Sequence, residues 1–310
     1  MSIKIRVKEL LDSIQEQYRV VGSIDRYVES ADPITQANNH SVSFSKDKSE
    51  RAYEMIRNSK AAVIICANNL TFSEEEFGNK TLIQVVNPRL TFSRLLAYFF
   101  LTKTEPVIHS TAVIDKLSII GRNVSIGAYS YIGESEIGDD TIIDGHVYIH
   151  PGTKIGKRVI IHAGVVIGTP ATAFERNPQG ELEAFPQISG VTIEDNVEIG
   201  ANSIICRGSL NNTLIGQGTK IDALVHVAHG VRIGKHCIVL AGTILCGSVK
   251  IGDQTWIGPQ ACIREGGIII GNRVTVGAGS VVHKDVIDDS VVTGSPARPI
   301  TQAWTKQRNL

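Results

Sequence analysis

The amino-acid sequence predicts a mainly β protein in which a parallel β-helix follows a small α/β domain. First, an aliphatic residue recurs every six positions from Ile108 to Val276, with a one-residue slip after Ile132, two longer interruptions at 169–190 and around 207–212, and a last stretch that begins at Ile270. Second, Ile and Val make up roughly a fifth of the 310 residues while aromatic residues make up 5%, a bias toward β structure. Third, residues 1–105 lack the six-residue period, which indicates a separate domain.

The six-residue period fits neither a helix of 3.6 residues per turn nor a strand that alternates between two faces. A hexad is about one short strand plus a turn, and three hexads close a triangular coil of about 18 residues with the aliphatic side chains stacked inside. Glycine often follows the inward residue, as in Ile126-Gly127. We expect this glycine to provide the backbone conformation of the corner, which a Cβ would penalise.

The pattern divides the chain into three parts. We expect an α/β domain that binds a nucleotide sugar at 1–105, a β-helix at 106–292 with an inserted loop at 169–190, and a short tail at 293–310. In the first domain, the patterns predict helices at KELLDSIQEQ and at 87–100, where Pro88 begins the helix, and buried strands at 61–66 and 81–86. Thr102–Thr104 is the expected linker.

Charge and composition exclude several classes of protein. Lys+Arg and Asp+Glu both number 31, so the net charge is zero and a nucleic-acid-binding protein is not indicated. No apolar run approaches the roughly 18 residues of a membrane span, and charges occupy the N-terminus where a signal peptide has its apolar stretch. The five cysteines form no CxxC pair, which argues against a zinc knuckle or a disulfide framework. We therefore expect a cytoplasmic protein.

The inserted loop has the composition of a functional loop. It interrupts a strict repeat and contains Phe174, Arg176 and Phe185, side chains that are not expected in a surface loop without a function. The alternative is a surface loop that the repeat merely tolerates. Phe174 and Arg176 are therefore candidate substrate-binding residues.

Several segments resemble the UDP-3-O-acylglucosamine N-acyltransferases, a family of hexapeptide-repeat acyltransferases that act in lipid A synthesis. The segments are residues 225–252 (VHVAHGVRIGKHCIVLAGTILCGSVKIG), GVVIG, RGSLNNT, SVSF and NPRLTFSRLLAYF. The resemblance implies a left-handed coil and a homotrimer with active sites between subunits. It also implies transfer of an acyl group to the amine of a nucleotide-linked sugar.

The resemblance places the general base of the family at His229. Histidine suits this role near neutral pH, because acyl transfer to an amine requires a group that accepts the amine proton; the alternative is a surface histidine on a corner. One coil of 18 residues beyond His229 lies Gly247, whose backbone N–H is therefore expected to stack above the ring and to hold the developing oxyanion. A glycine kept only for the corner is the other interpretation.

Other candidate residues depart in part from the family pattern. Asn211 and Asn212 are candidate substrate-binding residues that stand where the family has an acidic pair. The sequence leaves open whether an Asn carbonyl or another group orients His229. Phe44 is a partial match to the aromatics that stack on the nucleotide base. His226, close to His229, is a candidate substrate-binding residue; a zinc site like that of hexapeptide-repeat carbonic anhydrases is the alternative, but it needs three converging histidines, and we expect no metal.

The C-terminal GSPARPI segment resembles that of acyl-CoA-dependent sugar acetyltransferases. We therefore expect acyl-CoA as the donor, with a short acyl group and with Arg264, Arg273 and Lys284 near its phosphates. These cations could equally be solvated corner residues.

The resulting hypothesis is a sugar N-acyltransferase that acts on a nucleotide-activated amino sugar in cell-surface polysaccharide or lipopolysaccharide synthesis. One alternative is the lipid A activity itself, with an acyl carrier protein as donor. Another, of a different class, is a non-catalytic β-helix scaffold or a carbonic-anhydrase-like metalloprotein.

Overall fold

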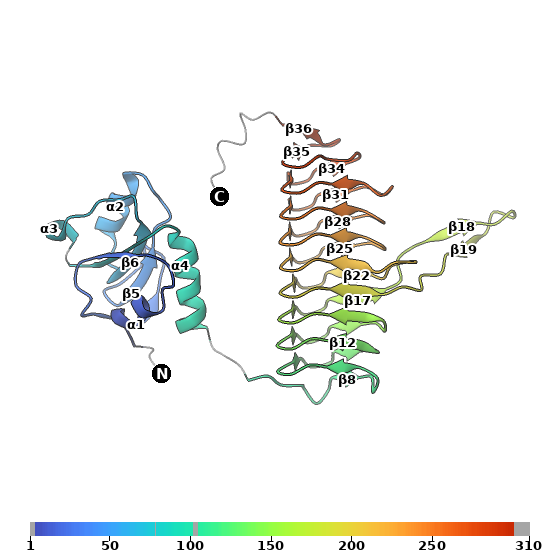
Figure 1. Ribbon diagram of the computed structural model, residues 1–310, viewed down its shortest axis with the longest axis horizontal. Helices are drawn as coiled ribbons and strands as arrows, with labels where there is room; N and C mark the ends of the chain where they lie inside the picture. Colours follow the sequence, from blue (N-terminus) through green and yellow to red (C-terminus); the bar gives the residue numbers. More distant parts are fainter. Residues whose placement is uncertain (1–3, 78, 102–104, 301–310) are drawn as a thin grey trace. The chain divides into compact units, whose positions relative to one another are not determined.

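The computed structural model describes residues 4–77, 79–101 and 105–300, and the chain divides into two compact units, 1–104 and 105–310 (Figure 1). Each unit has a hydrophobic core of its own.

The N-terminal unit is an α/β domain around a five-stranded sheet. The strand order is β2 (Arg19–Val21), β7 (Thr81–Val85), β6 (Val63–Ala67), β5 (Ser41–Phe44) and β4 (Ser30–Ala31). Only β2 runs antiparallel to its neighbour. The other elements are β1 (Ile5–Arg6), β3 (Tyr27–Val28), α1 (Val7–Asp12), α2 (Arg51–Asn58), α3 (Glu74–Phe77), α4 (Pro88–Leu95) and the π-helix η1 (Leu96–Phe100).

The structure confirms most of the elements predicted for this unit. Strands β6 and β7 are the two predicted buried strands, and every residue in them is buried. Helix α4 begins at Pro88, and the Asn87 side chain caps it by accepting a hydrogen bond from the Leu90 N–H. Helix α1 is shorter than predicted and ends at Asp12, because the polar residues beyond Ile14 give it no further apolar face. The predicted linker lies outside the described residues.

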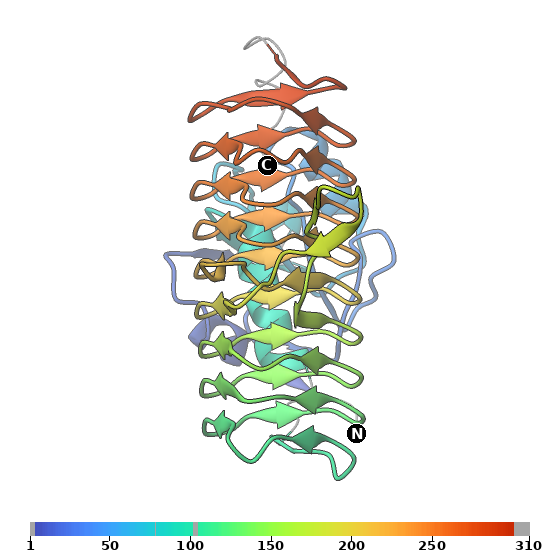
Figure 2. The same ribbon diagram turned by 90° about the vertical axis from the view of Figure 1, so that its right-hand side faces the viewer.

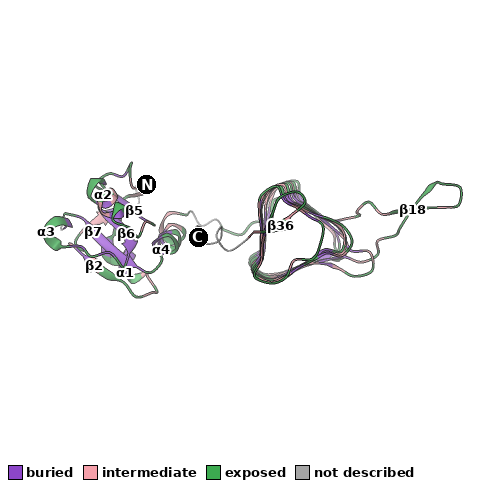
Figure 3. Cartoon of the chain, turned by 90° about the horizontal axis from the view of Figure 1, so that it is seen from above, coloured by how far each residue is buried: buried purple, intermediate pink, exposed green. Residues whose placement is uncertain are grey.

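The C-terminal unit is a parallel β-helix with three faces, as the six-residue period predicts; seen along its axis, the coil is triangular (Figure 3). Face 1 consists of β10 (Ser125–Ile126), β13 (Ile142–Ile143), β16 (Ile160–Ile161), β21 (Glu198–Ile199), β24 (Lys220–Ile221), β27 (Ile238–Val239), β30 (Trp256–Ile257), β33 (Thr275–Val276), β35 (Val291–Thr293) and β36 (Arg298–Pro299). Face 2 consists of β8 (Val113–Ile114), β11 (Tyr131–Ile132), β14 (Tyr148–Ile149), β17 (Val166–Thr169), β22 (Ile204–Cys206), β25 (His226–Val227), β28 (Ile244–Leu245), β31 (Cys262–Ile263) and β34 (Val281–Val282). Face 3 consists of β9 (Ile119–Ile120), β12 (Ser135–Ile137), β15 (Thr153–Ile155), β20 (Val191–Ile193), β23 (Thr213–Ile215), β26 (Arg232–Ile233), β29 (Lys250–Ile251) and β32 (Ile269–Ile270).

The aliphatic residues of the repeat form a continuous core inside the coil. Ile126, Ile143 and Ile161 are partners in register on successive strands of face 1, and each is at most 1% exposed. Burying a side chain of this size contributes about 1.5–3 kcal/mol, so the stack of aliphatic residues stabilises each coil against its neighbours.

The glycines after the inward residues serve a different purpose from the one predicted. Gly127 does not have a positive φ; a Cβ on it would lie 2.3 Å from the backbone nitrogen of Gly145 in the next coil. The left-handed conformation falls two residues later, for example at Tyr129 with φ 59° and at Asp140 with φ 59°. Gly127 and the glycines like it therefore allow adjacent backbones to approach, and the corner itself is made by other residues. Gly168, where the inserted loop leaves the coil, is an exception with φ 84°.

Two segments interrupt the regular coil at neighbouring levels. Residues 169–190 leave the coil between β17 and β20 and form the antiparallel hairpin β18 (Phe174–Arg176) and β19 (Leu182–Ala184). The hairpin projects from the stack (Figure 1) and lies in front of the coils in the view of Figure 2. Residues 207–212 form a shorter bulge between β22 and β23. The coil ends where β35 turns back through the GSPARPI segment into antiparallel β36.

Candidate active site

His229 and Gly247 occupy equivalent positions on successive coils. His229 follows β25, and Gly247 follows the next strand of the same face, β28, with Val227 and Leu245 as partners in register. A Cβ on Gly247 would lie 2.5 Å from Nε2 of His229. The predicted stacking is thus confirmed, and any side chain at position 247 would displace the imidazole ring.

The backbone beside the ring offers an unused hydrogen-bond donor. The Ser248 N–H donates to the His229 carbonyl over 2.9 Å and fixes the turn above the ring. Among the residues that the structure describes, none accepts a hydrogen bond from the Gly247 N–H, and none hydrogen-bonds to the His229 ring. A free N–H and a free imidazole therefore lie side by side.

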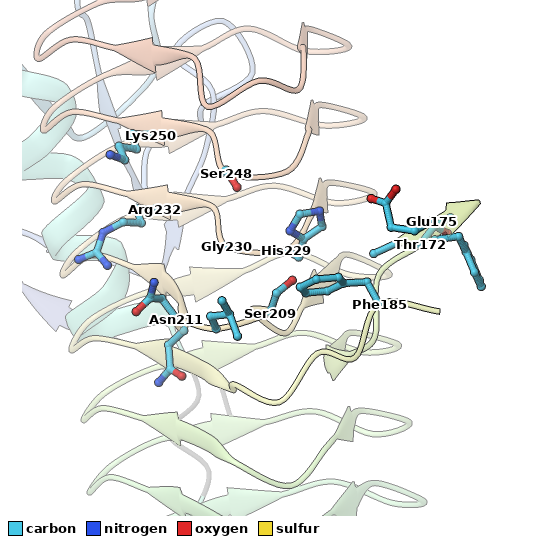
Figure 4. Close-up of a pocket in the computed structure, with 14 residues that line it drawn as sticks. Thr172, Glu175, Phe185, Ser209, Asn211, His229, Gly230, Arg232, Ser248 and Lys250 are labelled. Atoms are coloured by element: carbon cyan, nitrogen blue, oxygen red, sulfur yellow. The ribbon is translucent and has the colours of Figure 1, made fainter. Parts of the chain in front are cut away.

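His229 opens onto a cavity of about 1150 Å³ (Figure 4). The cavity is bounded by the inserted hairpin, by the bulge after β22 and by two successive coils. The lining residues are Thr172, Ala173, Phe174, Glu175, Phe185, Ser209, Leu210, Asn211, Asn212, His229, Gly230, Arg232, Ser248 and Lys250. Both interruptions of the repeat therefore meet at the candidate base.

Hydrogen bonds between the two interruptions hold them together. The Ile188 N–H donates to the Ser209 carbonyl over 3.0 Å. Asn212 Oδ1 accepts from Ser189 Oγ over 2.6 Å and from the Gly190 N–H over 2.9 Å. Because these donors already occupy the Asn212 carbonyl, Asn212 does not orient His229, a role that the sequence had left open for it. Asn212 instead fixes the base of the insertion.

Arg207 is a structural residue of the site that the sequence analysis did not identify. Its guanidinium donates to the carbonyl of Gly168 over 2.8 Å and to that of Pro151 over 2.7 Å. These bonds tie the bulge to the coils below it, where the inserted loop leaves the repeat. The only signal in the sequence was an arginine at the point where the hexads stop.

The structure separates the two candidates in the inserted hairpin. Phe174 lines the cavity and is 51% exposed, as Phe185 is at 45%. Arg176 is not among the lining residues, and its guanidinium donates to the Gly180 carbonyl over 2.7 Å within the hairpin. Arg176 therefore braces the turn, whereas the two aromatic rings form an exposed apolar wall.

His226 lies away from this cavity. It is the outward residue of β25 on face 2, in register with Ile204 and Ile244, and burial lowers its pKa. Among the described residues, no group of three or more His, Cys, Asp or Glu side chains is arranged to hold a metal ion.

Phe44 belongs to the N-terminal unit, where its ring stacks on Phe92 with centroids 4.8 Å apart. The side chain is only partly buried, so part of the ring is accessible. Tyr53, the other aromatic near SVSF, packs on Phe72 with centroids 5.0 Å apart, and its hydroxyl accepts from the Thr71 N–H. Tyr53 is therefore held by its own domain.

The cations predicted to meet the donor phosphates are for the most part paired. Arg273 makes two hydrogen bonds to the Asp289 carboxylate, over 2.6 and 2.7 Å. Arg264 donates to Glu265 over 3.1 Å. Lys284 is exposed, and no ion pair holds it among the described residues. Arg273 in particular is neutralised by its partner, which argues against its predicted role.

Two cations that the sequence analysis did not select, Arg232 and Lys250, line the cavity of His229. They are the outward residues of β26 and β29 and are partners in register. Their signal in the sequence was weak, because a lysine or arginine at an outward position of a hexad is an ordinary solvated residue.

The sequence matches two family models over the β-helix. Residues 134–169 and 212–247 match the bacterial transferase hexapeptide (six repeats), and residues 190–225 and 248–284 match the hexapeptide repeat of succinyl-transferase. None of the helices in the part of the chain that the structure describes has the length and apolar character of a membrane span.

Similar proteins extend this match to the N-terminal unit. The UDP-3-O-acylglucosamine N-acyltransferase of Coxiella burnetii (strain RSA 493 / Nine Mile phase I) is 32% identical over 315 residues, which cover 93% of this chain and 88% of the relative. The enzyme of the same name from Caulobacter sp. (strain K31) is 40% identical over 153 residues, but the match spans only 49% of this chain and 44% of that relative.

Solved structures share the coil. The UDP-N-acetylglucosamine O-acyltransferase of Moraxella catarrhalis aligns with a TM-score of 0.59 and 27% identity, over 66% of this chain and 78% of that one. The UDP-N-acetylglucosamine acyltransferase of Campylobacter jejuni aligns with a TM-score of 0.57 and 25% identity, over 65% and 78%. The fold is therefore the predicted left-handed β-helix of hexapeptide repeats with a small N-terminal α/β domain.

Proposed function

Because the chain belongs to the UDP-3-O-acylglucosamine N-acyltransferase family, we propose that it transfers an acyl group from a thioester to the amine of a nucleotide-linked amino sugar. The acceptor we propose is UDP-3-O-acylglucosamine, named by the relatives that align with nearly the whole chain. The observation that carries the proposal is the His229 ring beside the backbone of Gly247: neither the ring nor the Gly247 N–H has a hydrogen-bond partner among the described residues, and His229 lines a cavity of about 1150 Å³.

In the proposed mechanism the sugar amine attacks the thioester carbonyl, and a ring nitrogen of His229 takes the proton that the amine loses. A C–N bond forms, and the carbonyl oxygen becomes an oxyanion to which the Gly247 N–H donates a hydrogen bond. When the tetrahedral intermediate collapses, the C–S bond breaks and the thiolate receives the proton from His229. The histidine therefore ends each turnover in its starting state.

The walls of the cavity suit the rest of this reaction. The exposed rings of Phe174 and Phe185 provide an apolar surface for an acyl chain. Asn211 and Ser209 present polar groups from the bulge, and we propose that they contact the sugar. In the N-terminal unit, we propose that the accessible part of Phe44 stacks on the nucleotide base.

For the donor we propose an acyl thioester, with acyl-CoA as the form that the C-terminal segment favours. Since Asp289 pairs with Arg273 and Glu265 pairs with Arg264, Lys284 is the cation of the three on which this proposal now chiefly depends. Acyl carrier protein, an acidic donor that docks on a basic surface, is the alternative. We also propose a homotrimer, for which light scattering should give about three times the chain mass of 33.5 kDa.

The test incubates the purified chain with UDP-3-O-acylglucosamine and with matched acyl groups on coenzyme A and on acyl carrier protein, with products identified by mass spectrometry. An acylated amine that forms with either donor supports the proposed function. Initial rates at least tenfold higher with the carrier protein would replace acyl-CoA as the donor. If neither donor yields an N-acylated sugar, the proposed function is wrong.

A further inference from the structure

Two like charges face each other beside the candidate base. Arg232 and Lys250 are the outward residues of adjacent strands on face 3 and are paired in register. Neighbouring strands lie about 4.8 Å apart, and like charges placed directly opposite destabilise a sheet. This arrangement therefore costs stability unless an anion lies between the side chains.

The described part of the chain does not supply that anion. Among the described residues, no carboxylate lies within ion-pair distance of Arg232 or Lys250. Lower on the same face, Glu136 and Lys154 occupy equivalent register positions and form an ion pair of 2.7 Å. Face 3 thus pairs opposite charges at this lower level, and at the level of His229 it presents two cations.

The nearby carboxylates have other partners or lie elsewhere on the cavity wall. Asp253 accepts from the Lys235 N–H over 2.8 Å, and Asp288 accepts from the Asn272 amide over 2.9 Å. Glu194 accepts from the Gln217 N–H over 2.8 Å. Glu175, the acidic residue of the cavity lining, lies on the hairpin, across His229 from the two cations (Figure 4).

We propose that Arg232 and Lys250 bind the diphosphate of the nucleotide-linked acceptor and so position its amine at His229. This inference rests on the proposed function. A guanidinium and an ammonium on successive coils can each take one phosphoryl group, and the planar guanidinium offers two parallel donors.

Distance favours the acceptor over the donor as the source of the phosphate. Arg232 is three residues from His229, so their Cα atoms lie within about 11 Å of each other. In a nucleotide-linked 2-amino sugar, the amine and the diphosphate are on neighbouring ring carbons. In a pantetheine thioester, the whole length of the arm separates the phosphate from the reacting carbonyl. A phosphate this close to the base therefore belongs to the acceptor.

The test compares wild type with the double variant Arg232→Gln/Lys250→Met, and uses Lys154→Met as a control that removes a paired cation from the same face. Titration calorimetry with UDP measures the phosphate site without any acyl transfer. We expect the double variant to bind UDP at least tenfold more weakly and the control to stay within twofold. Thermal melts should show the unliganded double variant to be at least as stable as wild type, because a like-charge pair has been removed.

Kinetics provide the second measurement. The double variant should raise the KM for the acceptor at least tenfold and leave the KM for the donor within threefold. Arg232→Lys keeps the charge but loses the two parallel donors of the guanidinium, so its KM for the acceptor should lie between those of wild type and the double variant. Equal UDP affinity in wild type and double variant, or a shift in the KM of the donor alone, would overturn the inference. If UDP binding depends on the pair but no sugar is acylated, the phosphate site stands and the proposed function fails.

Discussion

The regular coils and the interrupted coils of this β-helix use their polar residues in opposite ways. In the regular coils, charges on the outside are paired between neighbours, as in Glu136–Lys154 at 2.7 Å and Arg122–Asp139 at 3.1 Å. In the interrupted coils, the side chains of Asn212 and Arg207 hold backbone groups of loops. The comparison shows that the repeat builds the support and that departures from the repeat build the site.

The inserted segments are tolerated because each coil contacts only its neighbours. An extra hairpin disturbs the coils above and below it and leaves more distant coils unchanged. The inward residues Ile167, Ile193 and Ile205 around the interruptions are at most 1% exposed, so the core continues through this region. The coil can therefore carry a functional excursion without losing its hydrophobic stack.

The largest effect is expected at the interrupted coils. His229→Ala should reduce turnover by about two to four orders of magnitude, as removal of a general base does, because the substrate amine then has no proton acceptor. His236→Ala is the matched control, since His236 is a corner histidine outside the cavity lining. Steady-state rates and thermal melts should show lost activity with little change in stability; full activity in the His229 variant would remove His229 from the mechanism.

A second prediction tests the regular coils through two adjacent residues. Ile143→Ala should lower the free energy of unfolding by about 2–5 kcal/mol, because the side chain is 1% exposed and its loss leaves a cavity. Ile142→Ala, at an outward position that is 42% exposed, should change it by about 0.5 kcal/mol or less. Denaturant titration measures both values. Equal losses in the two variants would contradict the inward stacking of the hexads.

A third prediction concerns the junction between the two interruptions. Asn212→Ala leaves the Ser189 hydroxyl and the Gly190 N–H without their acceptor and should cost about 1–3 kcal/mol. Asn211→Ala is the control, because Asn211 lines the same cavity from an exposed position. Hydrogen exchange should increase at residues 188–190 in the Asn212 variant alone. Unchanged exchange there would show that the insertion is held by other contacts.

The smallest effect is a pH dependence at His162, which lies on the coils that flank the inserted hairpin. The pKa of His162 is raised, first by its hydrogen bond to Glu198 and then by Asp144, each carboxylate lying 3.1 Å from the ring. Its contribution to stability is therefore fully present below the ordinary pKa of 6.5 and is lost as the pH rises through the raised value.

Because the ring is partly exposed, this contribution should be below about 1 kcal/mol. Thermal melts of wild type and His162→Gln should differ at pH 5.5 and converge at alkaline pH. A difference that is constant with pH would mean that the two carboxylates do not couple to the ring.

The sequence by itself determined the β-helix, its triangular coil, its inward residues and the level at which His229 meets Gly247. Periodicity could do this because every coil repeats the same local requirement, an aliphatic residue facing inward every six positions. The same regularity made the 18-residue count to Gly247 reliable within an unbroken stretch. The expectation for the glycines was wrong. The period shows where a small residue is needed, but it does not show whether the reason is a positive φ or the close approach of a neighbouring backbone.

Only the tertiary structure decided which polar residues are free. Arg273 and Arg232 are both exposed cations on the outside of the coil. Asp289 pairs with Arg273, whereas Arg232 lines the cavity. Asn211 and Asn212 are neighbours in sequence, but only the amide of Asn212 is bound to the insertion. The physical reason is that the partners of these side chains lie 16 or more positions away in the sequence. The stacking of coils brings some of them together, and the path of the insertion, which follows no period, brings the others.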